Sequence, residues 1–232
     1  MTSVLSLWSE RGFGIHEPPE YGFVRLKIFV IKHKHNFMNF KPLQKKRLFV
    51  GIPITDELKN KLKNSIHQNI SLPFCRWVPM ENYHVTTLFL GPVNENEIDQ
   101  IREIIQETCL ATKPFTLQFD SFTSAPKKSP YMIWAKFNRH KTFDHIVLKL
   151  SKSLTPSKKH KPKPVPHITL CRLRKFKPLG NFNDSQLKSQ YILVNKLILW
   201  ESITNEKGVT YDEIDRFQLS INKKRILTNS GL

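Results

Sequence analysis

The sequence has few cysteines, no long apolar run and few acidic residues, and each shortage narrows what the chain can be. Its three cysteines, Cys75, Cys109 and Cys171, are odd in number, far apart and without a CxxC pair. They predict neither a disulfide framework nor a cysteine metal site, and they favour a reduced, cytoplasmic protein whose cysteines pack in its core. No apolar run can span a bilayer, and the first seven residues lack the features of a signal peptide.

Acidic residues are also scarce. The chain has 19 Asp and Glu and 37 Lys and Arg, which give a formal net charge of +18. Such an excess favours a polyanionic partner such as nucleic acid, through phosphate neutralisation and counterion release. A proteome rich in lysine would give the same excess without such a partner. The distribution favours the nucleic acid, because the segment 152–177 contains nine Lys or Arg and no acid.

What the chain does contain is a regular apolar pattern, with 39% hydrophobic residues among 232. Alternating and continuous apolar runs predict strands at 46–52, 83–90, 115–119, 131–137, 167–173, 192–201 and 216–221. Helical spacing predicts helices that begin at 55 or 56, at a capping box in 94–97, and at 141. Several strands follow one another directly, which favours an α+β fold with antiparallel or mixed sheets over a doubly wound parallel sheet.

The first 45 residues lack this pattern. We therefore expect an N-terminal extension at 1–45, one two-lobed domain at 46–221 and a C-terminal tail at 222–232. The sequence leaves two explanations of residues 1–37 open: a flexible extension, or a segment upstream of the working start codon, with Met38 as the initiator. We expect a monomer.

The frame His-apolar-Thr occurs twice, at 84–86 and at 167–169, and each copy begins a predicted strand. Residues i and i+2 of a strand point to the same face, so the histidine and the threonine of each copy lie side by side. Two similar lobes related by a pseudo-twofold axis would bring the copies together. The result is a cleft between the lobes with two imidazoles and two hydroxyls.

This arrangement suits the opening of a cyclic phosphodiester by water. Imidazole, with an unperturbed pKa of about 6.5, can act as acid or base at neutral pH, so one ring can activate water while the other protonates the leaving oxygen. The hydroxyls of Thr86 and Thr169 can donate to the non-bridging oxygens. Arg172 has the opposite parity to His167, and it reaches a phosphate only if the strand twists or ends before it.

The two histidine frames and the nearby aromatic residues also have simpler, structural interpretations. One His-x-Thr frame alone is more often structural than functional, so the argument rests on there being two. Paired histidines also bind metals, but no HExxH, adjacent acid or Cys/His cluster accompanies them, so we expect no metal and no cofactor. Phe89 and Trp134 could stack on bases, although such side chains are more often core residues.

Residues 76–91, RWVPMENYHVTTLFLG, strongly resemble the first signature of the RNA 2′,3′-cyclic phosphodiesterases, in the two-histidine phosphoesterase superfamily. Residues 166–172, PHITLCR, resemble the second signature. Residues 46–53 and 197–219 are similar to the family's first strand and closing hairpin, so the resemblance covers about 46–221. It implies a bilobal α+β fold and hydrolysis of an RNA 2′,3′-cyclic phosphate to a 2′-phosphate.

The resemblance also implies a role for each site residue. His84 donates a proton to the leaving 3′ oxygen, and His167 accepts one from water. Thr86 and Thr169 hold the phosphate, and Arg172 matches the arginine that closes the family's second motif. Some members also join tRNA half-molecules through a 2′–5′ linkage, which is the reverse reaction. The implied partners are tRNA fragments or oligoribonucleotides with cyclic phosphate ends.

The chain departs from the family pattern at two places. Thr87 stands where the family more often has Leu, on the face opposite His84, where it should affect packing rather than chemistry. The loop 158–163 is unusually dense in lysine, which favours a longer RNA. Two other functions stay open: a non-catalytic RNA-binding module of the same fold, and a phosphodiesterase for 2′–5′ oligoadenylates or a cyclic nucleotide.

Overall fold

The residues that a computed structural model describes are 45–69, 75–156, 164–173, 184–206 and 208–220. They all belong to one unit, residues 40–232. The expected N-terminal extension apart from Lys45, the lysine-rich loop 158–163 and the expected tail lie outside the described residues. Within the described ranges, no helix combines the length and the apolar character needed to cross a membrane.

The described residues form nine strands and three α-helices. The strands are β1 (Lys45–Pro53), β2 (Cys75–Trp77), β3 (His84–Asn94), β4 (Phe115–Ala125), β5 (Met132–Phe137), β6 (His167–Leu173), β7 (Tyr191–Val194), β8 (Lys196–Asn205) and β9 (Gly208–Gln218). The helices are α1 (Asp56–Asn69), α2 (Ile98–Leu110) and α3 (Lys141–Leu154). The three predicted helices are confirmed. The pattern missed β2, and the strand predicted at 192–201 is two strands separated by Asn195.

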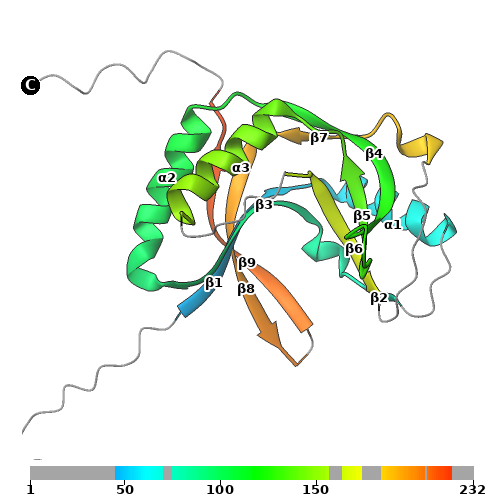
Figure 1. The fold of residues 1–232 in the computed structure, drawn as a ribbon, viewed down its shortest axis with the longest axis horizontal. Coiled ribbons are helices and arrows are strands. Elements are labelled where there is room, and N and C mark those ends of the chain that lie inside the picture. The colour runs from blue at the N-terminus through cyan, green and yellow to red at the C-terminus, as the bar shows by residue number, and fades with distance from the viewer. Residues whose placement is uncertain (1–44, 70–74, 157–163, 174–183, 207, 221–232) are drawn as a thin grey trace, which may run out of the picture. The chain divides into compact units, whose positions relative to one another are not determined.

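The strands form two antiparallel sheets (Figure 1), as the α+β prediction required. One sheet has four strands in the order β3-β1-β8-β9, and the other has five in the order β2-β6-β5-β4-β7. Strands β3 and β6, which carry the two His-apolar-Thr frames, belong to different sheets and contact each other. The two frames therefore lie where the two sheets meet.

The helices cover one face of each sheet. Helices α2 and α3 contact each other and the four-stranded sheet through β3, β8 and β9. Helix α1 lies along the five-stranded sheet (Figure 1), where the ring of His67 contacts the ring of Trp77 in β2. Its residues Leu58, Leu62 and Ile66 are buried at the predicted i, i+4 spacing. The opposite faces of the sheets remain for the site.

Strands β3 and β6 carry the same irregularity at the same place. The register between β3 and β1 shifts beyond Thr86, and the register between β6 and β5 shifts beyond Thr169. Each shift inserts one extra residue, Thr87 in β3 and Leu170 in β6, which is a β-bulge. The first seven residues of both strands consequently have the same order of half-buried, buried and exposed side chains. This match supports the predicted pseudo-twofold relation.

The cysteine prediction was wrong for two of the three residues. A disulfide joins Cys75 of β2 to Cys171 of β6. The pattern did not predict β2, so it gave no sign that two cysteines 96 residues apart lie on neighbouring strands. Cys109 is a buried free cysteine in α2, as expected.

Candidate active site

The first histidine of the repeated frame, His84, lies in a pocket of aromatic side chains. Its ring centroid is 4.9 Å from that of Phe49, 5.5 Å from that of Trp200 and 5.2 Å from that of Tyr211. These rings come from β1, β8 and β9, so every strand of the four-stranded sheet contributes to the surroundings of His84. The sequence analysis identified none of the three, because they lie far from His84 in the chain.

Gly51 provides the space for this packing. It pairs with Thr86, and a Cβ atom there would lie 2.8 Å from the carbonyl oxygen of Val85, 3.0 Å from the indole of Trp200 and 3.4 Å from the His84 ring. Distances below about 3.4 Å require the neighbours to move. A side chain at position 51 would therefore displace the imidazole or its indole neighbour.

Hydrogen bonds define the tautomer of His84. Its Nδ1 lies 2.8 Å from the backbone oxygen of Asn82, and a carbonyl can only accept, so Nδ1 carries the proton. Its Nε2 lies 2.9 Å from Oγ1 of Thr86, which confirms that the two side chains share a face. The amide of Asn82 in turn donates to the backbone oxygen of Val209 in β9 at 2.7 Å. Asn82 therefore holds the carbonyl that orients the ring.

Burial lowers the pKa of His84 to about 4, because the aromatic surroundings disfavour the charged imidazolium. The hydrogen bond to Asn82 opposes this change, and positive charge on His167 adds to it. Strands β3 and β6, which carry the two imidazoles, contact each other where the two sheets meet. The structure thus brings together the two histidines that the repeat predicted would meet.

His167 has a matching hydrogen bond but a different neighbour. Its Nδ1 lies 2.8 Å from the backbone oxygen of Val165, so its proton is also on Nδ1 and Nε2 is again the nitrogen without a proton. The ring stacks on Trp134, with 3.7 Å between centroids and 24° between planes. Burial lowers its pKa, and the hydrogen bond to Val165 opposes that change. Thr169 pairs with Trp134 across β5 and β6.

The bulge at Leu170 turns Arg172 toward the site. Thr169 pairs with Trp134, and Arg172 pairs with Met132. Since Met132 and Trp134 are two residues apart on a strand, they share a face, and so do their cross-strand partners. On a straight strand, the alternation of side chains would place Arg172 on the face opposite to His167. The extra residue Leu170 brings it to the same face.

Both aromatic residues proposed for base stacking lie on the site side of their sheets. Phe89 pairs with Phe49, whose ring faces His84, and its own side chain is 63% exposed. The core interpretation was therefore wrong for Phe89. Trp134 is half-buried against His167. Thr87 lies on the opposite face as predicted, buried, with its hydroxyl donating to the backbone oxygen of Val50.

Two other features complete the description. In the described part of the chain, no three His, Cys, Asp or Glu residues are grouped so as to hold a metal ion. A separate surface hollow of about 450 Å³ lies where α2 ends and α3 begins, with Lys113, Lys141 and His145 in its lining. Neither His84 nor His167 lines it.

The sequence of the chain matches one known protein family. The model of the 2′-5′ RNA ligase superfamily matches residues 56–191, which is more than half of the chain. The chain belongs to the 2′-5′ RNA ligase superfamily. The matched segment contains both His-apolar-Thr frames, whereas Phe49, Trp200 and Tyr211, which surround His84, lie outside it.

Individual members of the superfamily agree with this assignment. A protein of Bacillus subtilis named RNA 2′,3′-cyclic phosphodiesterase is 24% identical over 184 residues, covering 74% of this chain and 96% of its own length. Escherichia coli LigT without a ligand has the same fold, with a TM-score of 0.65 and 20% identity over 76% of this chain and 99% of that protein. A LigT structure with 3′-AMP matches with a TM-score of 0.63 and 19% identity, over the same shares of the two chains.

Proposed function

We propose that this protein hydrolyses the 2′,3′-cyclic phosphate at the end of an RNA and leaves a 2′-phosphate. The observation that carries the proposal is the matched pair of imidazoles on β3 and β6. Each has its Nδ1 proton bonded to a backbone oxygen two residues earlier, which directs Nε2 toward the reacting group. The distant relative from Bacillus subtilis, whose name states this activity, supports the choice of substrate.

The proposed step is an in-line displacement at phosphorus. Water attacks the phosphorus atom, and its proton passes to Nε2 of His167. The bond between phosphorus and the 3′ oxygen breaks, and that oxygen receives a proton from Nε2 of His84. Thr86, Thr169 and Arg172 hold the non-bridging oxygens, on which negative charge develops. The products are a 2′-phosphate and a free 3′-hydroxyl, and the reverse of this step would join ends through a 2′–5′ linkage.

The electrostatics of the site restrict the protonation states. With a pKa of about 4, His84 is neutral at neutral pH in the free protein, whereas a proton donor has to be charged. A phosphate anion beside the ring favours the imidazolium and raises its pKa. In this proposal the bound substrate therefore provides the negative charge that allows His84 to take up the proton it later donates.

The test is turnover of an oligoribonucleotide that ends in a 2′,3′-cyclic phosphate, measured in EDTA because the proposed step needs no metal ion. The product end is identified by mass and by phosphatase sensitivity. His84→Ala and His167→Ala should each lower kcat by about 10²–10⁴-fold, the usual contribution of one acid or base. His145→Ala, at an exposed position away from both frames, should retain activity.

The other functions predict different results in the same assay. A non-catalytic RNA-binding module would bind the oligoribonucleotide without turnover. A phosphodiesterase for 2′–5′ oligoadenylates would cleave those and leave the cyclic end intact. Turnover that survives both histidine substitutions would overturn the proposed site.

A further inference from the structure

Two arginines lie side by side at the edge of the five-stranded sheet. Arg76 of β2 and Arg172 of β6 are directly opposite each other in the antiparallel pair, and both are exposed. Cross-strand partners share a face, so Arg76 lies on the same face as Arg172, Thr169 and His167. Like charges in this position repel and destabilise a sheet, so the pair calls for an explanation.

Neither arginine is neutralised by an acid. Among the described residues, Arg102, Arg139 and Arg216 form ion pairs with Asp or Glu, and no carboxylate lies within ion-pair distance of Arg76 or Arg172. Lys136, on the same face of the neighbouring strand β5, is paired with Asp120 at 2.6 Å. The two arginines are therefore free to bind an anion, whereas Lys136 is not.

The positive charge of Arg172 acts on a residue of the other sheet. The guanidinium of Arg172 contacts the sulfur of Met132 at 3.5 Å, and its positive charge opposes the rise that burial causes in the pKa of Tyr211. Tyr211 belongs to β9 and packs against His84. Arg172 thus lies between the reacting site and Arg76, which is one strand, about 4.8 Å, farther toward the edge of the sheet.

The surface beyond the pair has the character of a single-stranded RNA site. Strand β5 is preceded by the exposed residues Lys127, Lys128 and Tyr131, and the backbone oxygen of Tyr131 accepts a hydrogen bond from Leu173, next to Arg172. Met132, the residue after Tyr131, pairs with Arg172, so Tyr131 lies at the Arg172 end of the five-stranded sheet. Basic groups together with an exposed aromatic ring are the usual components of such sites.

We propose that Arg76, which lies beside Arg172 on the neighbouring strand, binds the phosphate of the nucleotide that precedes the cyclic end. This inference rests on the proposed function and makes it more specific, because the preferred substrate is then an oligoribonucleotide rather than a 2′,3′-cyclic mononucleotide. Guanidinium groups suit this role because they bind phosphate through two parallel hydrogen bonds. The RNA leaves the site across β2, the edge strand.

The test compares 2′,3′-cyclic AMP with a trinucleotide that ends in the same cyclic adenosine. The wild type should have a higher kcat/KM for the trinucleotide, and Arg76→Gln should lower the ratio of the two values about tenfold, as expected for the loss of a charged hydrogen bond. Arg76→Lys should restore it only in part, because lysine lacks the planar fork. An equal loss for both substrates, or no loss, would overturn the proposal.

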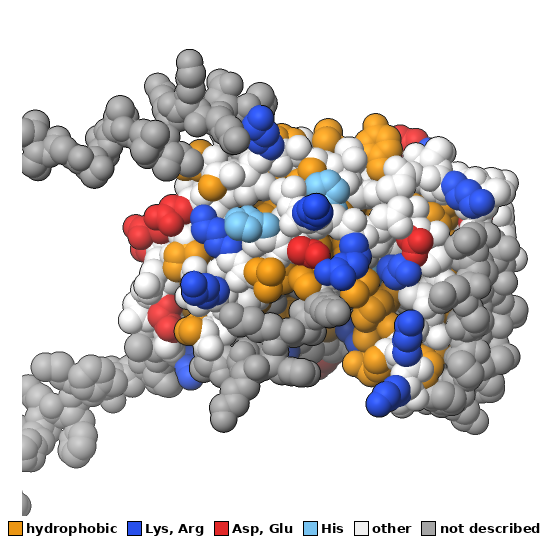
Figure 2. All heavy atoms as spheres, turned by 45° about the horizontal axis from the view of Figure 1, so that its top comes forward, with side chains coloured by type: hydrophobic (Ala, Val, Ile, Leu, Met, Phe, Trp, Pro, Cys, Tyr) orange, Lys and Arg blue, Asp and Glu red, His pale blue; other side chains and the backbone are white. Residues whose placement is uncertain are grey.

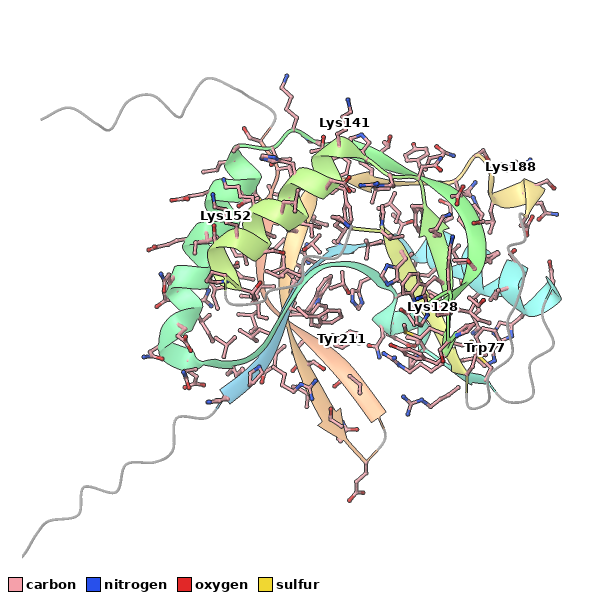
Figure 3. The ribbon with its side chains drawn as sticks, in the orientation of Figure 1. Trp77, Lys128, Lys141, Lys152, Lys188 and Tyr211 are labelled. Atoms are coloured by element: carbon pink, nitrogen blue, oxygen red, sulfur yellow. A yellow bond between two sulfur atoms is a disulfide. The ribbon has the colours of Figure 1, made fainter. Side chains whose placement is uncertain are left out.

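General attraction between a basic protein and RNA needs its own control. Figure 2 shows Lys and Arg side chains spread over one face of the molecule, with few acidic side chains among them. Lys141→Gln removes one positive charge at the hollow where α2 ends and α3 begins, far in Figure 3 from Trp77, the neighbour of Arg76 in β2, and should leave the ratio unchanged. A ratio that falls equally in both variants would mean that net charge alone selects the longer substrate, and it would overturn the role of Arg76.

Failure of the proposed function is distinguishable from failure of this inference. If the wild type hydrolyses neither substrate, the proposed function is wrong. The arginine pair is then tested by calorimetric binding of a trinucleotide with a 2′-phosphate end and of 2′-AMP. Weaker trinucleotide binding by Arg76→Gln, with a salt slope shallower by about 0.7, supports a phosphate contact at Arg76. Identical binding by both proteins overturns it.

Discussion

The two histidine strands have the same backbone pattern and different surroundings. In β3, the residue opposite the threonine is Gly51, and the indole of Trp200 reaches the histidine from the next strand across that glycine. In β6, the residue opposite the threonine is Trp134, which stacks on the histidine directly. After the bulge, the same position is Phe89 in one strand and Arg172 in the other.

The two strands share the backbone arrangement of the repeated frame, whereas the side chains around their histidines differ. The duplicated frame places two imidazoles in one orientation, each held through Nδ1. The proposed reaction has one acid and one base, which have to differ, and the side chains from neighbouring strands give the two histidines different surroundings. His84 has three aromatic neighbours, whereas His167 has one, Trp134 of β5, and shares its own strand with the cation Arg172.

The largest expected effect is a loss of stability at acidic pH, caused by the burial of His84. The folded-state pKa of His84 is about 4 against about 6.5 unfolded, so between these values the unfolded chain binds a proton that the folded chain cannot. Stability should therefore fall as the pH drops from 6.5 to 4, by about 3 kcal/mol from this residue. Urea unfolding at pH 7 and 4.5 should show a smaller loss for His84→Gln, and the wild-type loss for His145→Gln. Equal losses in all three proteins would contradict the aromatic burial of His84.

Gly51→Ala should disturb the surroundings of His84. The added methyl group meets the backbone oxygen of Val85 at 2.8 Å and the indole of Trp200 at 3.0 Å, so these two have to move, and we expect the imidazole that packs on this indole to move with them. Misplacement of a catalytic group by an ångström costs on the order of 100-fold in rate, and we expect a loss of kcat near that size. Steady-state kinetics and thermal unfolding should be measured together. A wild-type kcat would mean that the position of the His84 ring does not depend on Gly51.

Trp134→Ala should disturb the surroundings of His167 and should lower kcat by a smaller factor than Gly51→Ala. Removal of the stacked indole exposes His167, so its pKa should rise toward 6.5, and the lost ring contact should lower kcat about tenfold. Histidine titration by NMR, together with kinetics, would check both effects. Trp77→Ala, which removes an indole from the other face of the same sheet, should leave the His167 titration unchanged.

Asn82→Ala should have the smallest effect. The variant loses the 2.7 Å hydrogen bond to Val209 and keeps the backbone oxygen that binds His84. A neutral hydrogen bond is worth about 1 kcal/mol, so we expect kcat to fall about fivefold with little change in KM. The exposed Asn138→Ala is the matched control. A lower melting temperature with an unchanged kcat would assign Asn82 a purely structural role.

Local signals predicted much of this fold. The capping box is present, since the backbone nitrogen of Asn94 donates to the Glu97 carboxylate at 2.9 Å, and the period-two rule placed Thr86 beside His84. The strand that bears His167 has the predicted bounds. Each of these features depends on residues within one turn of helix or one strand, where the sequence contains the relevant interactions.

Features that depend on neighbouring strands were not predictable in this way. The bulge at Leu170 reversed the side that Arg172 faces, and its only local sign is the apolar pair Leu170-Cys171. Strand β2 is too short for any periodicity to be visible. The aromatic neighbours of His84 come from three other strands, and without the sheet order the sequence could not identify them.

The sheet order has a consequence for the protein while it is being synthesised. The four-stranded sheet joins β1 and β3 to β8 and β9, the last two strands of the described residues. A nascent chain that has left the ribosome only as far as β7 contains both histidines but lacks Trp200 and Tyr211. Under the proposed function, the site is then incomplete until β8 and β9 emerge, so ribosome-bound intermediates should leave nearby RNA ends untouched.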